Sequence, residues 1–223
     1  LQHRGRESAG IATADGSYQF LHTAMGLVQQ AFQEFDLQRL PGHIAIGHTR
    51  YSTMGSSREQ NAQPILVQGL HGPLVLGHNG NVINALELRK ELVEQWGCTF
   101  SSTTDSEVIA HLLANAPGQN WGDRIRYAMR KLRGAYSLAV LLEDSLIAIR
   151  DPLGVRPLCL GKLSDGWVIA SESCALDHIG AQFVRELEAG EALRIDDSGP
   201  QTIHQSMSDR KGFCVFETIY FAR

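Results

Sequence analysis

The sequence lacks the features that define membrane and secreted proteins. Its longest apolar runs, such as residues 138–142, are far too short to span a bilayer. Residues 1–4 are polar with no apolar stretch behind them, so no secretory signal peptide opens the chain. Internal repeats, low-complexity tracts and blocks of like charge are also absent. We therefore expect a protein with no membrane contact.

Clustered cysteine and histidine are equally scarce. The four cysteines in 223 residues include no CxxC pair, which excludes the common zinc-site spacing. The nine histidines include no HxH or HxxxH pair, and scattered histidines are mostly structural. A disulfide framework is not expected at this length, so we predict a reducing, cytoplasmic location. Each cysteine is expected to be a small buried hydrophobic residue: Cys98, Cys159, Cys174 and Cys214.

Charge and composition exclude two further classes. The 20 Lys and Arg residues against 24 Asp and Glu give a formal net charge of −4, so no broad surface for nucleic acid is expected. Hydrophobic residues make up 43% and charged residues 20%, which excludes disorder as the main state. The length allows one layered domain with a sizeable core. Because the chain begins with Leu1 instead of Met and ends at Arg223 within a pattern, we expect a piece of a longer protein.

The hydrophobic periodicity changes twice along the chain. The first half mixes short strands with Gly-rich turns, including a hairpin turn at residues 14–17. Three helices follow, one starting at Asn84 as N-cap with Glu87 three residues on, the others at Thr104 and Trp121. The remaining expected strands are residues 43–48, 74–78, 136–142, 146–149, 167–170 and 191–195. Strands, then helices, then strands predict an α+β fold in which helices cover sheets.

The first polar cluster, HTRYST at residues 48–53, directly follows an apolar strand. Arg50 can grip a carboxylate there with two parallel hydrogen bonds. The competing interpretation is a surface arginine in an ion pair. Residues 54–59 are small and polar, and they fit a mobile lid.

Two further clusters offer donors and a carboxylate. The Asn79 side-chain amide and the Gly80 backbone N–H supply two donors aimed at one point, which suits an oxyanion. Asn-Gly is also the commonest tight-turn dipeptide, so a turn-only interpretation stays open. Asp105 lies near a predicted helix N-terminus, where the helix dipole favours it without any ligand. Its functional interpretation is a carboxylate that binds a substrate ammonium.

Together these groups fit one kind of substrate. An arginine for a carboxylate, an aspartate for an ammonium and paired donors for an oxyanion suit glutamine that is hydrolysed at its amide. The nucleophile is missing, because no cysteine lies in a cleft-like strand-to-turn context beside a base. Ser52 and Ser106 are the remaining candidates, and no motif supports either of them.

Five motifs occur in a fixed order along the chain. They are QHRGRESAG at residues 2–10, GHTRYST at 47–53, GHNGN at 77–81, TDSE at 104–107 and RDPLGVRPL at 150–158. The set closely resembles the glutaminase domain of class II, N-terminal nucleophile glutamine amidotransferases, over nearly the whole chain. Within that superfamily, residues 3–5 and the ending CVFETIYFAR at 214–223 resemble the amidophosphoribosyltransferase family.

This resemblance implies a fold and a set of roles. The fold would be a four-layer αββα sandwich, the N-terminal nucleophile hydrolase fold, here missing its first strand. Arg50 would bind the α-carboxylate of glutamine and Asp105 its α-amino group. Asn79 and Gly80 would form the oxyanion hole.

The resemblance also implies residues around that pocket. Arg4 would lie near the active centre, and the loop from Tyr51 to Ser57, which includes Thr53, would close over glutamine when the second substrate binds. The nucleophile of the family is an N-terminal cysteine whose own α-amine serves as base, upstream of residues 3–5. No cysteine of this chain replaces it, so the chain alone is expected to be inactive.

For the intact protein the resemblance implies glutamine and phosphoribosyl pyrophosphate as substrates, and a homo-oligomer. Residues 1–212 would form the amidotransferase domain, and residues 213–223 would start the connection into a phosphoribosyltransferase domain served by Mg²⁺. Some members carry a [4Fe–4S] cluster, for which Cys214 is the candidate ligand. Two alternatives stay open: a synthase of the glucosamine-6-phosphate synthase type, and a non-catalytic glutamine-binding module.

Overall fold

The computed structural model describes residues 1–51, 58–206, 208, 212–215, 217 and 219. Every neighbouring pair of strands within its three sheets is antiparallel. Among the described residues, no helix combines the length and apolar character that a bilayer crossing requires.

A six-stranded sheet forms the centre of the molecule, in the order β12-β11-β7-β6-β5-β4. Its longest strand, β5, pairs with β6 over residues 75–82 and with β4 over residues 72–76. The strands are β4 (Ile65–Gly69), β5 (Gly72–Val82), β6 (Gly134–Leu141), β7 (Leu146–Arg150), β11 (Glu191–Asp196) and β12 (Gly199–Gln205).

Two three-stranded sheets pack against this central sheet, in the orders β2-β1-β3 and β10-β8-β9. Their strands are β1 (Ser8–Ala14), β2 (Gln19–Met25), β3 (Ile44–Arg50), β8 (Cys159–Lys162), β9 (Trp167–Ala170) and β10 (Gln182–Glu186). Among the described residues, β3 ends one of these sheets and β9 ends the other.

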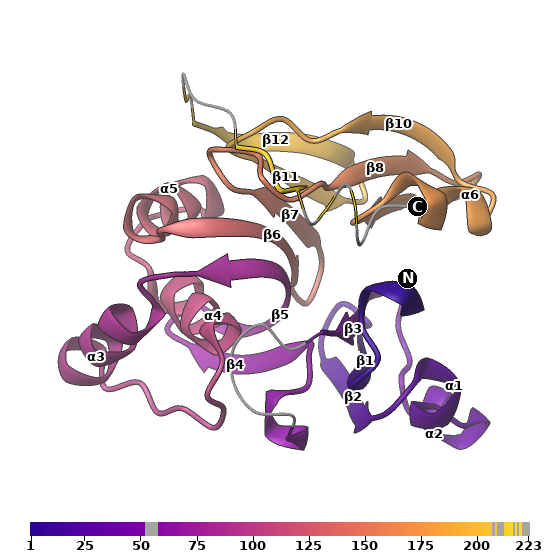
Figure 1. Ribbon diagram of the computed structural model, residues 1–223, viewed down its shortest axis with the longest axis horizontal. Helices are drawn as coiled ribbons and strands as arrows, with labels where there is room; N and C mark the ends of the chain where they lie inside the picture. Colours follow the sequence, from indigo (N-terminus) through magenta and orange to yellow (C-terminus); the bar gives the residue numbers. More distant parts are fainter. Residues whose placement is uncertain (52–57, 207, 209–211, 216, 218, 220–223) are drawn as a thin grey trace.

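Helices cover both outer faces of this double layer of sheets. Figure 1 shows α3, α4 and α5 beyond the central sheet on the left, and α1, α2 and α6 beyond the smaller sheets on the right. The helices are α1 (Val28–Ala31), α2 (Glu34–Gln38), α3 (Ala85–Trp96), α4 (Asp105–Asn115), α5 (Trp121–Lys131) and α6 (Ser173–His178), with 3₁₀ turns η1 (Gln2–Arg4) and η2 (Glu59–Asn61). The arrangement is the predicted α+β, four-layer αββα sandwich.

Alternation along the central strands explains the two main cores. In β5, Leu74 and Leu76 face the helices, while Val75 faces the two smaller sheets. Successive side chains of a strand point to opposite faces, so a strand buried on both sides reads as a continuous apolar run. Ala12 and Leu160 extend the core between the sheets.

The predicted helix starts are partly confirmed. Thr104 caps α4, because its side chain accepts a hydrogen bond from the Glu107 backbone N–H. The predicted capping box of Asn84 and Glu87 is wrong, since the Asn84 side chain makes no cap hydrogen bond. It instead donates to the carbonyl of Lys131 at 2.9 Å and accepts from the N–H of Arg133 at 3.0 Å. Asn84 thereby satisfies backbone groups at the end of α5.

Candidate active site

The three polar clusters of the sequence line a single small pocket. It has a volume of about 100 Å³ and lies where β3, β5 and the start of α4 meet. Six of the predicted site residues contribute to its wall: Arg4, Arg50, Tyr51, Asn79, Gly80 and Asp105. Of the loop predicted to close over the substrate, Tyr51 is described, whereas residues 52–57, Thr53 among them, lie outside the described residues.

Arg50 is the last residue of β3, paired with Ser8 of β1. Its side chain is only 3% exposed, and its Nη1 donates to Oε2 of Glu7 at 2.9 Å. The surface-arginine interpretation is therefore wrong, although an ion pair is present. A buried guanidinium at a pocket wall is a strong partner for a carboxylate, because little water competes with it.

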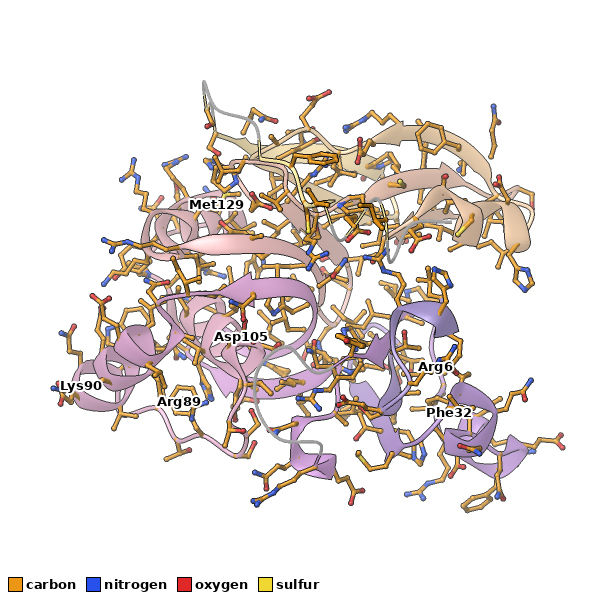
Figure 2. All side chains as sticks on the ribbon, in the orientation of Figure 1. Arg6, Phe32, Arg89, Lys90, Asp105 and Met129 are labelled. Atoms are coloured by element: carbon orange, nitrogen blue, oxygen red, sulfur yellow. The ribbon has the colours of Figure 1, made fainter. Side chains whose placement is uncertain are left out.

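Asp105 is the first residue of α4 and is buried. Its Oδ2 accepts a hydrogen bond from the backbone N–H of Val82 at 2.9 Å and lies 3.9 Å from Nδ1 of His78. Figure 2 labels Asp105 at the start of its helix, in the interior of the molecule. The carboxylate thus has the helix N-terminus as a favourable setting and the pocket as a place for a cationic ligand.

Asn79 and Gly80 lie inside β5, opposite Ser137 and Tyr136 of β6. The turn-only interpretation is therefore wrong. Gly80 has φ +154°, and a Cβ there would lie 2.0 Å from the carbonyl oxygen of Ala135, so only glycine fits. The Nδ2 of Asn79 is buried and has no hydrogen-bond partner among the described residues. A buried amide donor without a partner costs stability unless a ligand accepts from it.

Two histidines, His48 and His78, line the same pocket. Nδ1 of His78 lies 3.0 Å from Oγ of Ser106, and the backbone N–H of His78 donates to Oε1 of Gln63 at 2.8 Å. Nε2 of His48 lies 3.0 Å from the His78 carbonyl oxygen. Burial lowers the pKa of His48 to about 4, so its ring is neutral at pH 7 and Nε2–H is the donor. Burial also lowers the pKa of His78, although Asp105 opposes that shift.

The lowered pKa values of these histidines predict that the free energy of unfolding decreases in acid. The pKa of His48 is about 4 in the folded chain against 6.5 for the ordinary side chain, so the unfolded chain binds more protons between these values. Unfolding free energy should therefore decrease as pH falls from 6.5 to 4, by at most about 1.4 kcal/mol per pH unit for each such histidine. Urea unfolding at several pH values measures this slope. In the His48→Gln variant this slope should be smaller by the contribution of one titrating group, up to about 1.4 kcal/mol per pH unit. An unchanged slope would contradict a buried, neutral His48.

A second cavity separates the open edges of β3 and β9. Its volume is about 230 Å³, and its lining includes residues 45–48 of β3 and residues 167–171, which comprise β9 and the residue after it. Asn79 lines both this cavity and the pocket of Arg50. Unpaired strand edges expose backbone donors and acceptors that another strand can satisfy. The cavity is thus a slot bounded by two such edges, and it opens onto the predicted oxyanion hole.

No described cysteine lines the pocket of Arg50. Burial raises the pKa of the Cys159 thiol to about 11, and burial likewise raises the pKa of Cys98 and Cys174. Protonated thiols are poor nucleophiles at neutral pH. The sequence-based conclusion that none of these cysteines is the nucleophile agrees with their positions.

Cys214 lines a different cavity of about 590 Å³, together with Cys159. A [4Fe–4S] cluster needs four thiolates, and the described residues do not gather a set of cysteines around Cys214. A cluster bound through Cys214 therefore stays a prediction. The described acidic residues likewise form no group of oxygen ligands of the kind that holds Mg²⁺.

His3, Glu172 and Cys174 bring three ligand-type atoms within 4.8 Å of one another. The Glu172 carboxylate is already held by the Arg4 guanidinium, by His3 at 3.0 Å and by the Cys174 thiol at 3.2 Å. Burial alone would raise the pKa of Glu172, but these three hydrogen bonds lower it to about 2. Because the Arg4 guanidinium opposes a second cation, we assign this cluster to ion pairing.

Sequence reasoning assigned no role to several residues of the pocket wall. His48 belongs to the GHTRYST motif and His78 to the GHNGN motif, but their burial and tautomers depend on the packing of β3 against β5. Arg156, in the RDPLGVRPL motif, also lines the pocket and was not assigned. The signal in the sequence that points to Arg156 is its place in this motif, directly after the turn at residues 151–154.

Comparison with known proteins identifies the family of the chain. Residues 48–178, more than half of the chain, match the family model described as glutamine amidotransferase domain. The chain belongs to this glutamine amidotransferase family. All of the pocket residues from β3, β5 and α4 discussed above lie within the matched range.

Two curated relatives illustrate the similarity over the whole chain. The amidophosphoribosyltransferase of Synechococcus elongatus is 49% identical over 229 residues, covering 100% of this chain and 46% of the relative. That of Mus musculus is 43% identical, covering 100% and 48%. The chain thus spans about half the length of the curated relatives it matches.

Solved structures give the same result for the fold. The glutamine phosphoribosylpyrophosphate (PRPP) amidotransferase from B. subtilis, complexed with ADP and GMP, superposes with a TM-score of 0.91 at 41% identity, covering 100% of this chain and 48% of that one. A glutamine aminotransferase class-II domain protein from Silicibacter pomeroyi shares the fold, with a TM-score of 0.57 at 17% identity over 87% of this chain and 89% of that one.

Proposed function

We propose that this chain is the glutaminase part of an amidophosphoribosyltransferase. The complete protein would convert glutamine, phosphoribosyl pyrophosphate and water to 5-phosphoribosylamine, glutamate and pyrophosphate, a step of purine biosynthesis. The curated relatives from Synechococcus elongatus and Mus musculus both carry this name, which favours it over the glucosamine-6-phosphate synthase type. The observation that carries the proposal is the meeting of Arg50, Asp105 and Asn79 in one pocket.

In this proposal the pocket holds glutamine by its two charged ends. Arg50 binds the α-carboxylate through its guanidinium, and Asp105 accepts hydrogen bonds from the α-ammonium. The side-chain amide of glutamine then reaches Asn79 and Gly80. Tyr51, which is 56% exposed at the rim, would contact the substrate from the solvent side together with Thr53.

The chemistry is acyl transfer to a thiol. An N-terminal cysteine attacks the amide carbon, its own α-amine takes the thiol proton, and the carbonyl oxygen becomes an oxyanion. Nδ2 of Asn79 and the Gly80 N–H donate to that oxyanion, ammonia leaves, and water hydrolyses the thioester to glutamate. We propose that a strand bearing this cysteine, in a segment that precedes Leu1, fills the slot between β3 and β9.

The remaining parts of the proposal concern the complete protein. Residues 1–212 form the amidotransferase domain, and residues 213–223 begin the connection to a transferase domain that uses Mg²⁺. The N–H of Gly212 donates to the carbonyl of Leu153 at 2.7 Å, so this connection starts against the turn after β7. A homo-oligomer and a reducing cytoplasm remain predictions, and the four free cysteines fit the reducing compartment.

A glutamine analogue with an electrophilic carbon in place of the amide tests the proposal. In the complete protein it should label an N-terminal cysteine and abolish phosphoribosylamine formation from glutamine, while formation from ammonia continues. Peptide mapping by mass spectrometry locates the label. Labelling of Cys98, Cys159, Cys174 or Cys214 instead would overturn the assignment.

A further inference from the structure

Two arginines besides Arg50 stand in the wall of the pocket. Arg4 comes from η1 near the start of the chain, and Arg156 follows the turn after β7. Neither is needed to bind the charged ends of glutamine in the proposal above. Three guanidinium groups around a small pocket would make it strongly attractive to anions of any kind.

Two buried glutamates compensate for this charge. Arg4 is paired with Glu172, and its Nη1 also lies 2.6 Å from Oε1 of Glu217. The other carboxylate oxygen of Glu217 lies 2.6 Å from Nη1 of Arg156. Glu217 is therefore a bridge between the two arginines, and it is 8% exposed. Charges that water cannot screen act on one another and on the pocket at nearly full strength.

The bridging carboxylate comes from the far end of the chain. The backbone N–H of Glu217 donates to the carbonyl of Cys214 at 3.1 Å, within the segment that Gly212 anchors to Leu153. A carboxylate at position 217 thus contributes to the charge of a pocket whose wall is built by residues between Leu1 and Ser171.

Substrate and product of the proposed reaction differ in charge at one place. The side chain of glutamine ends in a neutral amide, whereas that of glutamate ends in a carboxylate. When carboxylates neutralise Arg4 and Arg156, the pocket binds glutamine and glutamate with similar affinity. When one of these carboxylates is removed, the excess positive charge favours the binding of glutamate. We propose that Glu217 is a positioning residue that holds Arg4 and Arg156 and neutralises them, so that the pocket releases glutamate and discriminates in favour of the amide. This inference rests on the proposed glutaminase function.

Inhibition of glutamine hydrolysis by L-glutamate tests the inference in the complete protein. The ratio of the glutamate Ki to the glutamine KM should fall about tenfold in Glu217→Gln, because one negative charge beside the pocket is lost. Glu217→Asp keeps the charge and should retain the wild-type ratio. Arg156→Gln removes a positive charge and should raise the ratio, which provides a second test if Glu217→Gln does not fold.

A matched control separates this effect from the loss of any buried ion pair. Glu191 is also buried, with 2% exposed against 8% for Glu217, and it pairs with Arg185 at 2.7 Å, away from the pocket. Glu191→Gln should leave the ratio unchanged. If the wild type hydrolyses glutamine but Glu217→Gln and Arg156→Gln both keep its ratio, the inference is overturned and the proposed function stands. If the wild type neither binds nor hydrolyses glutamine, the proposed function itself fails.

Discussion

Replacing Asn79 with alanine should lower glutamine-dependent turnover of the complete protein by about 100-fold or more, the usual loss for one oxyanion donor. The expectation follows from Nδ2, a buried donor with no partner in the described structure. Ammonia-dependent synthesis of phosphoribosylamine should change little, since ammonia bypasses amide cleavage. Steady-state rates with glutamine and with ammonia measure both effects.

Asn81 provides the control for this substitution. It lies on the same strand, opposite Ala135 of β6, and it does not line the pocket. Asn81→Ala removes the same amide at a nearby position and should leave the glutamine rate near that of the wild type. Equal losses with glutamine and ammonia in Asn79→Ala would argue for a damaged fold instead of a lost donor.

Replacing Arg50 with alanine should raise the glutamine KM by about 30-fold or more. A buried, charge-assisted pair is lost in that variant, and the partner carboxylate of the substrate then enters the pocket uncompensated. Arg50→Lys keeps the charge but not the planar fork, so it should restore only part of the affinity. Rates as a function of glutamine concentration give KM and kcat separately. A variant with normal KM and reduced kcat would show that Arg50 does not bind the α-carboxylate.

Local patterns predict the three longer helices, α3, α4 and α5, and the hairpin between β1 and β2. Threonine is a favoured N-cap residue, so Thr104 before an apolar segment is a local signal for a helix start. The hairpin at residues 14–17 has its own local signal, the Asp-Gly dipeptide of its turn. The short or weakly patterned elements α1, α2, α6, β4, β8, β10 and β12 were not predicted. Their formation depends on the sheets and cores they join, which no short window of sequence contains.

The site could be predicted as a set of residue types but not as a geometry. Asn79-Gly80 has the local signal of a turn, yet the pairing with β6 holds it in an extended strand. The bridge from Glu217 to Arg4 and Arg156 joins residues from distant parts of the chain, so no spacing in the sequence indicates it. The slot between β3 and β9 likewise depends on how two separate sheets meet.

The central claim is that one pocket holds glutamine by both charged ends with its amide at Asn79 and Gly80. A crystal structure of the complete protein bound to the electrophilic glutamine analogue tests this most directly. We expect the α-carboxylate within hydrogen-bond distance of Arg50, the α-ammonium at Asp105 and the carbonyl oxygen at Nδ2 of Asn79. A ligand found in the cavity between Cys159 and Cys214, or one bound in the opposite direction, would contradict the account.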